Sequence, residues 1–356
     1  MKIITIVGAR PQFIKAAMIS RAIANHSDIK EQLIHTGQHY DEAMSSVFFR
    51  DMGIPKPTWM LQCGNSSHGA MTGKMLAEIE EILLNNRPDY VLVYGDTNST
   101  LAGALAASKL HIPVIHVEAG LRSFNKEMPE EINRILTDHI SSLLCCPTYA
   151  AVKHLANEGI TQGVHHVGDV MYDAAIVFGE WAKESSTIMS SLQLTGKQFR
   201  LCTVHRAENT DSPTRLTNIF EALCEIATTD CPVLLPLHPR TKNLLDTYGL
   251  SKKINLNPAL RLIPPLSFID MVLLEKQALN ILTDSGGIQK EAYFHGTPCI
   301  TLRDETEWTE TVEAGWNQIA GYKKDNILQC LTNHMPRKAI LEYGTGNAAE
   351  KIISLL

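Results

Sequence analysis

Several absences from the sequence exclude whole classes of protein. No run approaches the roughly 20 apolar residues that a membrane-spanning helix needs, so we expect no membrane partner. The apolar stretch in the opening segment, MKIITIVGARPQ, is too short for a signal peptide and is typical of a first strand. The net charge of -6 leaves no excess of positive charge with which to bind nucleic acid.

The cysteines and histidines also lack the spacing of a structural site. No C-x-x-C pair occurs among the eight cysteines, and Cys145 and Cys146 are adjacent, so neither a zinc site nor a disulfide framework is favoured. We therefore interpret them as reduced thiols of a cytoplasmic protein. His35 and His39 are four residues apart, but Gly37 lies between them and no third ligand is evident, so we predict no metal site.

The alternation of apolar and helical segments predicts the fold. Short apolar runs such as KIITIVG, DYVLVYGD and ALNILTD are continuously hydrophobic, which is typical of parallel strands covered on both faces. A chain of 356 residues is long enough for two domains. We predict an α/β fold of two doubly wound, Rossmann-like domains. The expected division is an N-terminal domain over 1–168, a C-terminal domain over 169–345, and a C-terminal helix over 346–356 that packs back on the N-terminal domain.

Polar side chains follow the strands of the first half, where open α/β sheets bind ligands. In GARPQFIK, Arg10 and Lys15 could clamp a phosphate or simply begin a solvated helix, and the G-x-G-x-x-G of a NAD site is absent from this turn. Asp96 ends the run VLVYGD and Glu118 ends the next strand, so one βαβ unit delivers two carboxylates to the same edge. Asp96 could alternatively cap the following helix.

The segment PEEINRILTDHISSLL predicts a helix over 129–144. One face of this helix is apolar and consists of Ile132, Ile135, Leu136, Ile140 and Leu143. Glu130 and Arg134 share the opposite face at i,i+4. They are either an exposed ion pair on a well-started helix or part of a polar face that lines a cleft between the two predicted domains.

Two motifs of the second half are suited to binding an anion. HRAEN places His205, Arg206 and Glu208 after an apolar strand, although an isolated histidine is often structural. In LTDSGGIQKEA, a strand turns through Ser285, Gly286 and Gly287 into a helix, so backbone amides could approach a phosphate. Glu291 on that helix could accept hydrogen bonds from ribose hydroxyls. The same turn is also compatible with an ordinary tight connection.

These motifs together resemble those of a known family. GARPQFIK, HTGQH, VLVYGDTNST, HVEAGLRS, PEEINR, HRAEN and LTDSGGIQKEA occur in this order over essentially the whole chain. They are similar to the motifs of the non-hydrolysing UDP-N-acetylglucosamine 2-epimerases. The resemblance implies a two-lobed glycosyltransferase-B architecture, a UDP-sugar held between the lobes, and a homodimer. It also implies inversion at carbon 2 of the sugar by elimination and re-addition of UDP, without a cofactor.

The resemblance assigns roles to the polar residues. It implies a set of residues that act on the sugar: Asp96, Glu118, Glu130, Arg134 and His205. It also implies a set that binds UDP: Arg10, Lys15, Arg206, Glu208, Ser285, Gly286, Gly287 and Glu291. A retained glycosyltransferase and a non-catalytic UDP-sugar sensor are the rival hypotheses, but three carboxylates suited to proton transfer favour the epimerase.

Some positions depart from the usual family pattern. Gln12 stands where the family usually has glutamate, and Trp308 stands where an arginine is usual. These departures are similar to the branch that acts on UDP-2,3-diacetamido-2,3-dideoxyglucuronate, a precursor of surface polysaccharides. We therefore predict a UDP-N-acetylglucosamine 2-epimerase, with the diacetamido-glucuronate as the alternative substrate.

Overall fold

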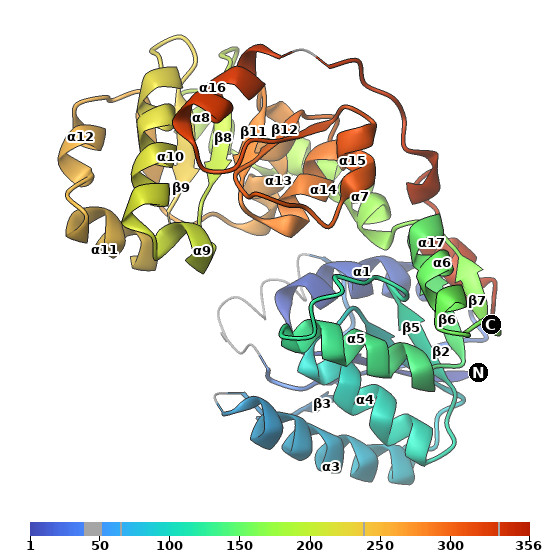
Figure 1. Ribbon diagram of the computed structural model, residues 1–356. Helices are drawn as coiled ribbons and strands as arrows, with labels where there is room; N and C mark the ends of the chain where they lie inside the picture. Colours follow the sequence, from blue (N-terminus) through green and yellow to red (C-terminus); the bar gives the residue numbers. More distant parts are fainter. Residues whose placement is uncertain (39–51, 65, 238, 334) are drawn as a thin grey trace. The chain divides into compact units, whose positions relative to one another are not determined.

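The computed structural model divides the chain into two compact units (Figure 1). Unit 1 comprises Met1–Ala174 and Leu341–Leu356, and unit 2 comprises Ala175–Ile340. The structure describes residues 1–38, 52–64, 66–237, 239–333 and 335–356, with the backbone alone at 10, 239 and 240, so His39 lies outside the described residues. The segments 169–174 and 341–345, which the sequence places in the C-terminal domain, fall in unit 1.

Unit 1 is built on a sheet that has seven strands among the described residues, all of them parallel to their neighbours. In spatial order the strands are β3 (Trp59–Met60), β2 (Lys30–His35), β1 (Lys2–Val7), β4 (Tyr90–Tyr94), β5 (Val114–Val117), β6 (Leu143–Cys146) and β7 (Val164–His166). The order runs outward in both directions from β1 and β4. The carboxyl ends of β1 and β4 therefore form the topological switch point at which open α/β sheets bind ligands.

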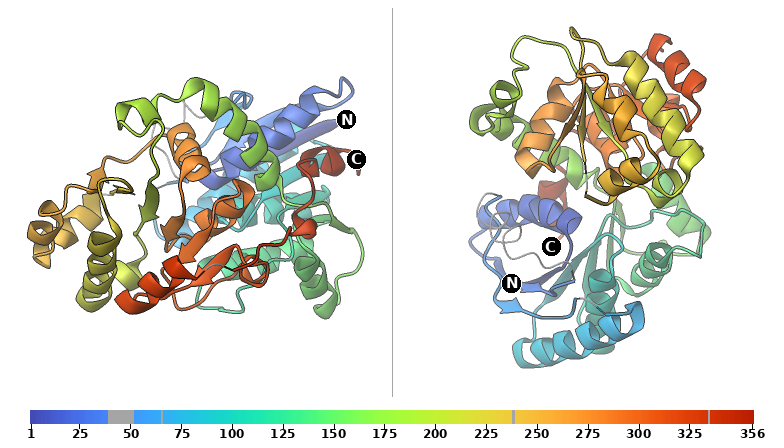
Figure 2. Two further views of the ribbon diagram at one scale, coloured as in Figure 1. Left: turned by 90° about the horizontal axis from the view of Figure 1, so that it is seen from above. Right: turned by 90° about the vertical axis from the view of Figure 1, so that its left-hand side faces the viewer.

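Helices cover both faces of this sheet. They are α1 (Arg10–Ala24), α3 (His68–Asn86), α4 (Asn98–Lys109), α5 (Pro129–Ile140), α6 (Tyr149–Asn157), the start of α7 (Val170–Ser185), the 3-10 turn η1 (Leu341–Tyr343) and α17 (Ala348–Ile353). Helices α3, α4 and α5 lie side by side on one face, and α1, against which α17 packs, lies on the other (Figures 1 and 2). Helix α4 approaches the sheet closely because its residues are small. A Cβ atom added at Gly103 would lie 2.5 Å from Ile6 Cδ1.

Unit 2 repeats the architecture with a parallel sheet of six strands among the residues that the structure describes. Their spatial order is β10 (Leu260–Ile263), β9 (Val233–Pro236), β8 (Arg200–Thr203), β11 (Ile281–Thr283), β12 (Cys299–Thr301) and β13 (Asn317–Ile319). The helices are the end of α7, α8 (Ile188–Ser191), α9 (Ala207–Thr210), α10 (Pro213–Ile226), α11 (Pro239–Thr247), α12 (Ser251–Asn255), α13 (Phe268–Gln277), α14 (Gly286–Phe294), α15 (Thr309–Glu313) and α16 (Lys324–Thr332). The predicted fold class, two doubly wound α/β domains, is confirmed.

The strands that the sequence does not predict are very short. β3 (WM), β7 (VHH) and β13 (NQI) contain two or three residues each, of which at most two are apolar, whereas the equally short β11 lies in the longer apolar segment ALNILTD. Within the described part of the chain, none of the helices combines the length and the apolar character that crossing a membrane requires. The eight cysteines are all free thiols.

Candidate active site

The turn after β4 brings Asp96 to the switch point of unit 1. Arg134 of α5 forms an ion pair with the Asp96 carboxylate, and Asn133 Nδ2 donates to the Asp96 carbonyl over 2.9 Å. About a third of the Asp96 side chain remains accessible (32%). Burial raises the pKa of Asp96, while Arg134 opposes that rise. The neighbouring helix is capped by Thr97, whose hydroxyl accepts from the Thr100 amide, so Asp96 is not the residue that caps it.

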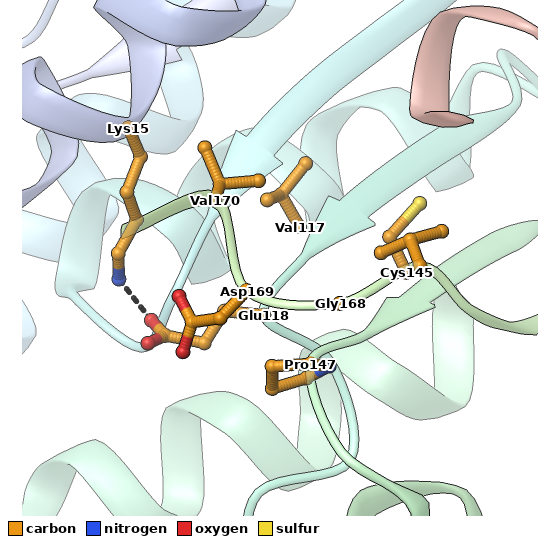
Figure 3. Close-up of a pocket in the computed structure, with 9 residues that line it drawn as sticks. Lys15, Val117, Glu118, Cys145, Pro147, Gly168, Asp169 and Val170 are labelled. Atoms are coloured by element: carbon orange, nitrogen blue, oxygen red, sulfur yellow. Dashed lines mark hydrogen bonds and ion pairs between the residues drawn. The ribbon is translucent and has the colours of Figure 1, made fainter. Parts of the chain in front are cut away.

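Glu118 follows β5 and lies beside Lys15 of α1. The two side chains form an ion pair, which Figure 3 shows at the edge of a small pocket of unit 1. Glu118 has a φ of 72°, in the left-handed region that side chains other than glycine rarely adopt. Such a conformation costs about 1–3 kcal/mol and clusters at functional sites. Asp169, which the sequence does not single out, is buried and lines the same pocket (Figure 3).

The two carboxylates and two cations form one electrostatic group. Glu118 raises the pKa of Asp96 further, and Lys15 lowers it, after the larger effects of burial and Arg134. Glu118 and Lys15 lie close to the backbone at Gly95, because this residue has no side chain. A Cβ atom at Gly95 would lie 3.1 Å from Glu118 Oε2 and 3.5 Å from Lys15 Nζ. Four of the predicted residues, Lys15, Asp96, Glu118 and Arg134, are therefore brought together by the fold of unit 1.

The ion pair between Glu130 and Arg134, one of the two interpretations of this helix, is not formed. Arg134 contacts Asp96 and, over 3.3 Å, Glu131 Oε2, whereas Glu130 is exposed in the first turn of α5. Glu131 is completely buried and accepts hydrogen bonds from the Ser123 amide, the Ser123 hydroxyl and the Phe124 amide, each over 2.9 Å. Glu131 thus orders the loop between β5 and α5. The sequence signal for it is the Glu-Glu pair, which does not reveal which glutamate is buried.

The apolar face identified from the sequence is not the face that α5 buries most deeply, since its residues Ile135 and Ile140 are only half-buried. Ile132 and Leu136 are 46% and 47% exposed, and the helix buries four polar residues instead. These are Glu131, Asn133, Thr137 and Asp138. The inversion is physically possible because the buried acids are matched: Asp138, for example, binds His116 and Arg122 over 2.7 and 2.6 Å. An exposed apolar stripe, consisting of Ile132 and Leu136, remains on the outside of α5.

In unit 2, a buried carboxylate organises the turn after β8. Asp284 is completely buried and accepts from the His205 amide over 3.0 Å and the Arg206 amide over 3.0 Å. The His205 ring lies 3.2 Å from Asp284 through Nδ1 and is half exposed. Glu208 is exposed and pairs with Arg215 over 2.8 Å. Asp284 is missed by the sequence reasoning, although an aspartate at the end of LTD, directly before SGG, is a detectable signal.

The other predicted residues of unit 2 lie at the beginning of α14 or on this helix. Ser285 precedes the helix without capping it through its side chain, and Gly287 lies close to both Ser285 and Glu291. A Cβ atom at Gly286 would meet Glu307 Oε1 at 2.0 Å, so the Glu307 carboxylate lies against the first turn of α14. A carboxylate is favourable at this positive helix end, as a phosphate would be. The first turn of α14 therefore presents its positive end to one negatively charged group of the protein itself, the Glu307 carboxylate.

Comparison with known proteins places this geometry in a family. The model of the UDP-N-acetylglucosamine 2-epimerase family matches residues 21–356. The chain belongs to the UDP-N-acetylglucosamine 2-epimerase family. The predicted resemblance is confirmed. The side chain of one predicted residue, Arg10, lies outside what the structure describes.

Members of the epimerase family resemble the chain over its full length. It is 51% identical to a UDP-N-acetylglucosamine 2-epimerase homolog of Methanococcus maripaludis, over 100% of this chain and 99% of that protein. It is 49% identical to the UDP-2,3-diacetamido-2,3-dideoxy-D-glucuronate 2-epimerase of Pseudomonas aeruginosa, again over 100% and 99%. The crystal structure of Methanocaldococcus jannaschii UDP-GlcNAc 2-epimerase in complex with UDP-GlcNAc and UDP superimposes with a TM-score of 0.87, at 43% identity and over 100% and 99% of the two chains.

Two departures from the epimerase pattern have structural partners. Gln12 is buried; its Oε1 accepts from the Gly8 amide over 2.8 Å, and its Nε2 donates to the Tyr94 carbonyl over 2.9 Å. Trp308 is buried in unit 2, with Lys290 Nζ 4.3 Å from the centre of its ring. Among the described residues, no group of three or more histidine, cysteine, aspartate or glutamate side chains is arranged to hold a metal ion.

Proposed function

We propose that the chain is a UDP-N-acetylglucosamine 2-epimerase, an isomerase that interconverts UDP-GlcNAc and UDP-ManNAc-type sugars. The observation that carries the proposal is the pairing of Asp96 with Arg134 and of Glu118 with Lys15 at adjacent strand ends. Carbon 2 of the sugar is weakly acidic, so removing its proton needs positioned bases. Two carboxylates of different environment, each held by a cation, are suited to taking and returning that proton.

The reaction proceeds by elimination and re-addition. A carboxylate removes the proton from carbon 2, the bond between carbon 1 and the UDP oxygen breaks, and an unsaturated glycal forms. UDP then re-forms the bond to carbon 1 while a proton is delivered to carbon 2 on the opposite face. Asp96, Glu118 and Glu130 are the proposed proton-transfer groups. Arg134 and His205 are the proposed groups that stabilise charge on the sugar and the departing diphosphate.

UDP binding is assigned to a second set of residues. The amides at Ser285, Gly286 and Gly287 are proposed to hold the diphosphate, and Glu291 the ribose hydroxyls. Positive charge is proposed to come from the side chains of Arg10, Lys15 and Arg206. Glu208 is proposed to act in the same site. Its pairing with Arg215 supports a role in orienting that part of unit 2.

The alternative substrate is UDP-2,3-diacetamido-2,3-dideoxyglucuronate. The relative of Pseudomonas aeruginosa that carries this name, and the tryptophan at 308, support it. Either product would serve as a precursor for surface polysaccharide. We further propose a cytoplasmic location, which the eight free cysteines support.

The decisive experiment is incubation of the protein with each UDP-sugar in D2O, followed by NMR. We expect deuterium at carbon 2 and a manno-configured product with one of the two sugars, without added NAD or acceptor. The sugar that exchanges faster identifies the substrate. UDP-sugar binding with no exchange on either sugar contradicts an epimerase and favours a UDP-sugar sensor, and transfer of the sugar to an acceptor favours a glycosyltransferase.

Replacing Arg134 with methionine is expected to shift the pH dependence of catalysis. Arg134 lowers the pKa of Asp96 against the effect of burial, so its removal raises that pKa further. Less Asp96 is then ionised at a given acidic pH, and the acidic limb of the kcat/KM profile moves to higher pH. Arg134→Lys retains the charge and should restore part of the shift. An unchanged acidic limb in Arg134→Met contradicts the role proposed for Asp96.

We also propose that the chain forms a homodimer through the exposed apolar stripe of α5, Ile132 and Leu136. Ile132 and Leu136 are neighbours at i,i+4 on α5 and are each about half exposed, so a partner surface that covers them would remove apolar area from water. We propose that a second copy of the chain covers this stripe. In a two-fold dimer the same surface of each copy faces the other, so the two stripes would cover each other.

The oligomeric state tests this face directly. We expect the wild-type chain to run at twice its 39.4 kDa mass in size-exclusion chromatography with light scattering. The double variant Ile132→Lys with Leu136→Lys should run as a monomer. Leu256→Lys, at a position 84% exposed in unit 2, is the control and should remain a dimer. A dimer that survives the double variant assigns the interface to another surface.

A further inference from the structure

A buried charged cluster lies behind the two strand ends of unit 1. His116 of β5 is completely buried. Its Nδ1 lies 2.7 Å from Asp138 Oδ1, and its Nε2 lies 2.7 Å from the Gly95 carbonyl oxygen. The second Asp138 oxygen accepts from Arg122 Nη1 over 2.6 Å and from the Gly120 amide over 3.1 Å. His116 therefore bridges α5 and the turn that precedes Asp96.

The hydrogen-bond partners fix the protonation of the His116 ring. The Gly95 carbonyl can only accept, so Nε2 carries a hydrogen and donates it. Asp138 is an acceptor, because its Oδ2 takes hydrogen bonds from Arg122 Nη1 and the Gly120 amide, and the Arg122 guanidinium beside it favours the ionised carboxylate. A carboxylate also only accepts, so Nδ1 donates as well. The ring carries hydrogens on both nitrogens.

The cluster fixes the backbone on both sides of the candidate site. Gly95 has a φ of 61°, a left-handed conformation immediately before Asp96, and its carbonyl is held by His116. Its amide donates to the Val117 carbonyl over 2.9 Å, next to Glu118. Through Gly120 and Arg122, Asp138 holds the loop that follows Glu118. One buried acid and one imidazole thus set the direction of both strand ends.

We propose that His116, held between Asp138 and the Gly95 carbonyl, is a positioning residue that aligns Asp96 with Glu118 for proton transfer at the sugar. The inference rests on the proposed function, because alignment matters for catalysis only if these carboxylates exchange the proton on carbon 2. A displacement of about 1 Å in such a group costs about 10²-fold in rate. The His116 side chain is completely buried, so it is out of reach of the sugar and acts through the Gly95 turn.

Two substitutions separate the two hydrogen bonds. In His116→Asn the amide lies near the position of Nδ1, so it can bind Asp138 but not the Gly95 carbonyl. In His116→Gln the amide lies near the position of Nε2 and can still donate to that carbonyl. We expect His116→Asn to lower kcat and the rate of deuterium exchange at carbon 2 by about 10²-fold, with KM and UDP affinity within a few fold. His116→Gln should retain clearly more activity.

The control is His166→Asn. His166 Nε2 also lies close to a backbone carbonyl oxygen, that of Glu342, over 2.7 Å, but His166 contacts neither the turn before Asp96 nor the loop after Glu118. Its kcat should stay near that of the wild type. A kcat for His116→Asn near that of the wild type, or equal losses in the two His116 variants, overturns the proposal. A wild-type protein without exchange on any UDP-sugar instead overturns the proposed function.

A measurement on the wild-type protein keeps the proposal testable if the variants fail to fold. Nitrogen-15 NMR of the histidine side chains should show one buried ring with hydrogens on both nitrogens. Its signal is assigned to His116 through the coupling to the β5 backbone, or by its absence from the spectrum of His116→Gln where that variant folds. A His116 ring with a single proton contradicts the bridge between Asp138 and Gly95 and overturns the proposal.

Discussion

Replacement of Glu118 with glutamine is expected to lower kcat by about 10²–10⁴-fold, the usual contribution of a positioned acid–base group. Glutamine preserves the size of the side chain but can neither accept the proton of carbon 2 nor neutralise Lys15. The rate of deuterium exchange at carbon 2 should fall in parallel, because both measure the same proton transfer. UDP affinity, measured by calorimetry, should change only a few fold.

A second variant separates lost proton transfer from an unpaired cation. Glu118→Gln leaves the Lys15 ammonium, whose side chain is only 9% exposed, without its carboxylate partner. The double variant Lys15→Met with Glu118→Gln removes that cation too. If Glu118 transfers the proton, the double variant is no more active than Glu118→Gln. Recovered activity in the double variant instead traces the loss to the unpaired ammonium.

Glu130→Gln is the second variant for which we expect a large loss of activity. If Glu130 transfers a proton, kcat falls by about 10²–10⁴-fold while UDP affinity stays within a few fold. The structure makes this variant informative because Glu130 is exposed, is not paired with Arg134 and can be changed without disturbing the buried cluster. Steady-state kinetics and calorimetry on the same preparation measure the two quantities.

The control for Glu130 is Glu127→Gln, a change of the same charge at an exposed position of the preceding loop. It should leave kcat close to that of the wild type. If Glu130→Gln also keeps near-wild-type activity, Glu130 has only the role of an acidic residue in the first turn of a helix, which contributes about 0.3–1 kcal/mol through the helix dipole.

The sequence predicts the features that depend on chain order and strand hydrophobicity. A parallel sheet places consecutive strand ends at one edge, so the proximity of Asp96 and Glu118 follows from the runs that precede them. Lys15 follows the first strand and arrives at the same edge. The residues of α5 that pair with these side chains are harder to predict, because the pairing also depends on which face of α5 is turned toward the sheet.

Helix α5 shows why this orientation is not predictable from the apolar pattern. Periodicity indicates which residues share a face, but not whether that face meets the core or the outside of the unit. Glu131 and Asp138 are buried because loop amides, His116 and Arg122 satisfy them, and those donors come from other segments of the chain. Asp284 in unit 2 is another such case, since its donors follow a strand some eighty residues earlier.

The return of the chain to unit 1 bears on how the protein folds as it is synthesised. The buried Asp173 carboxylate accepts from the Ala348 and Ala349 amides over 3.1 and 2.8 Å, and the Asp169 amide donates to the Tyr343 carbonyl. Unit 2 lies between these partners in the sequence. Unit 1, whose strands are synthesised first, therefore cannot be completed until α17 has been synthesised. Unit 2 is synthesised later but can be completed before unit 1.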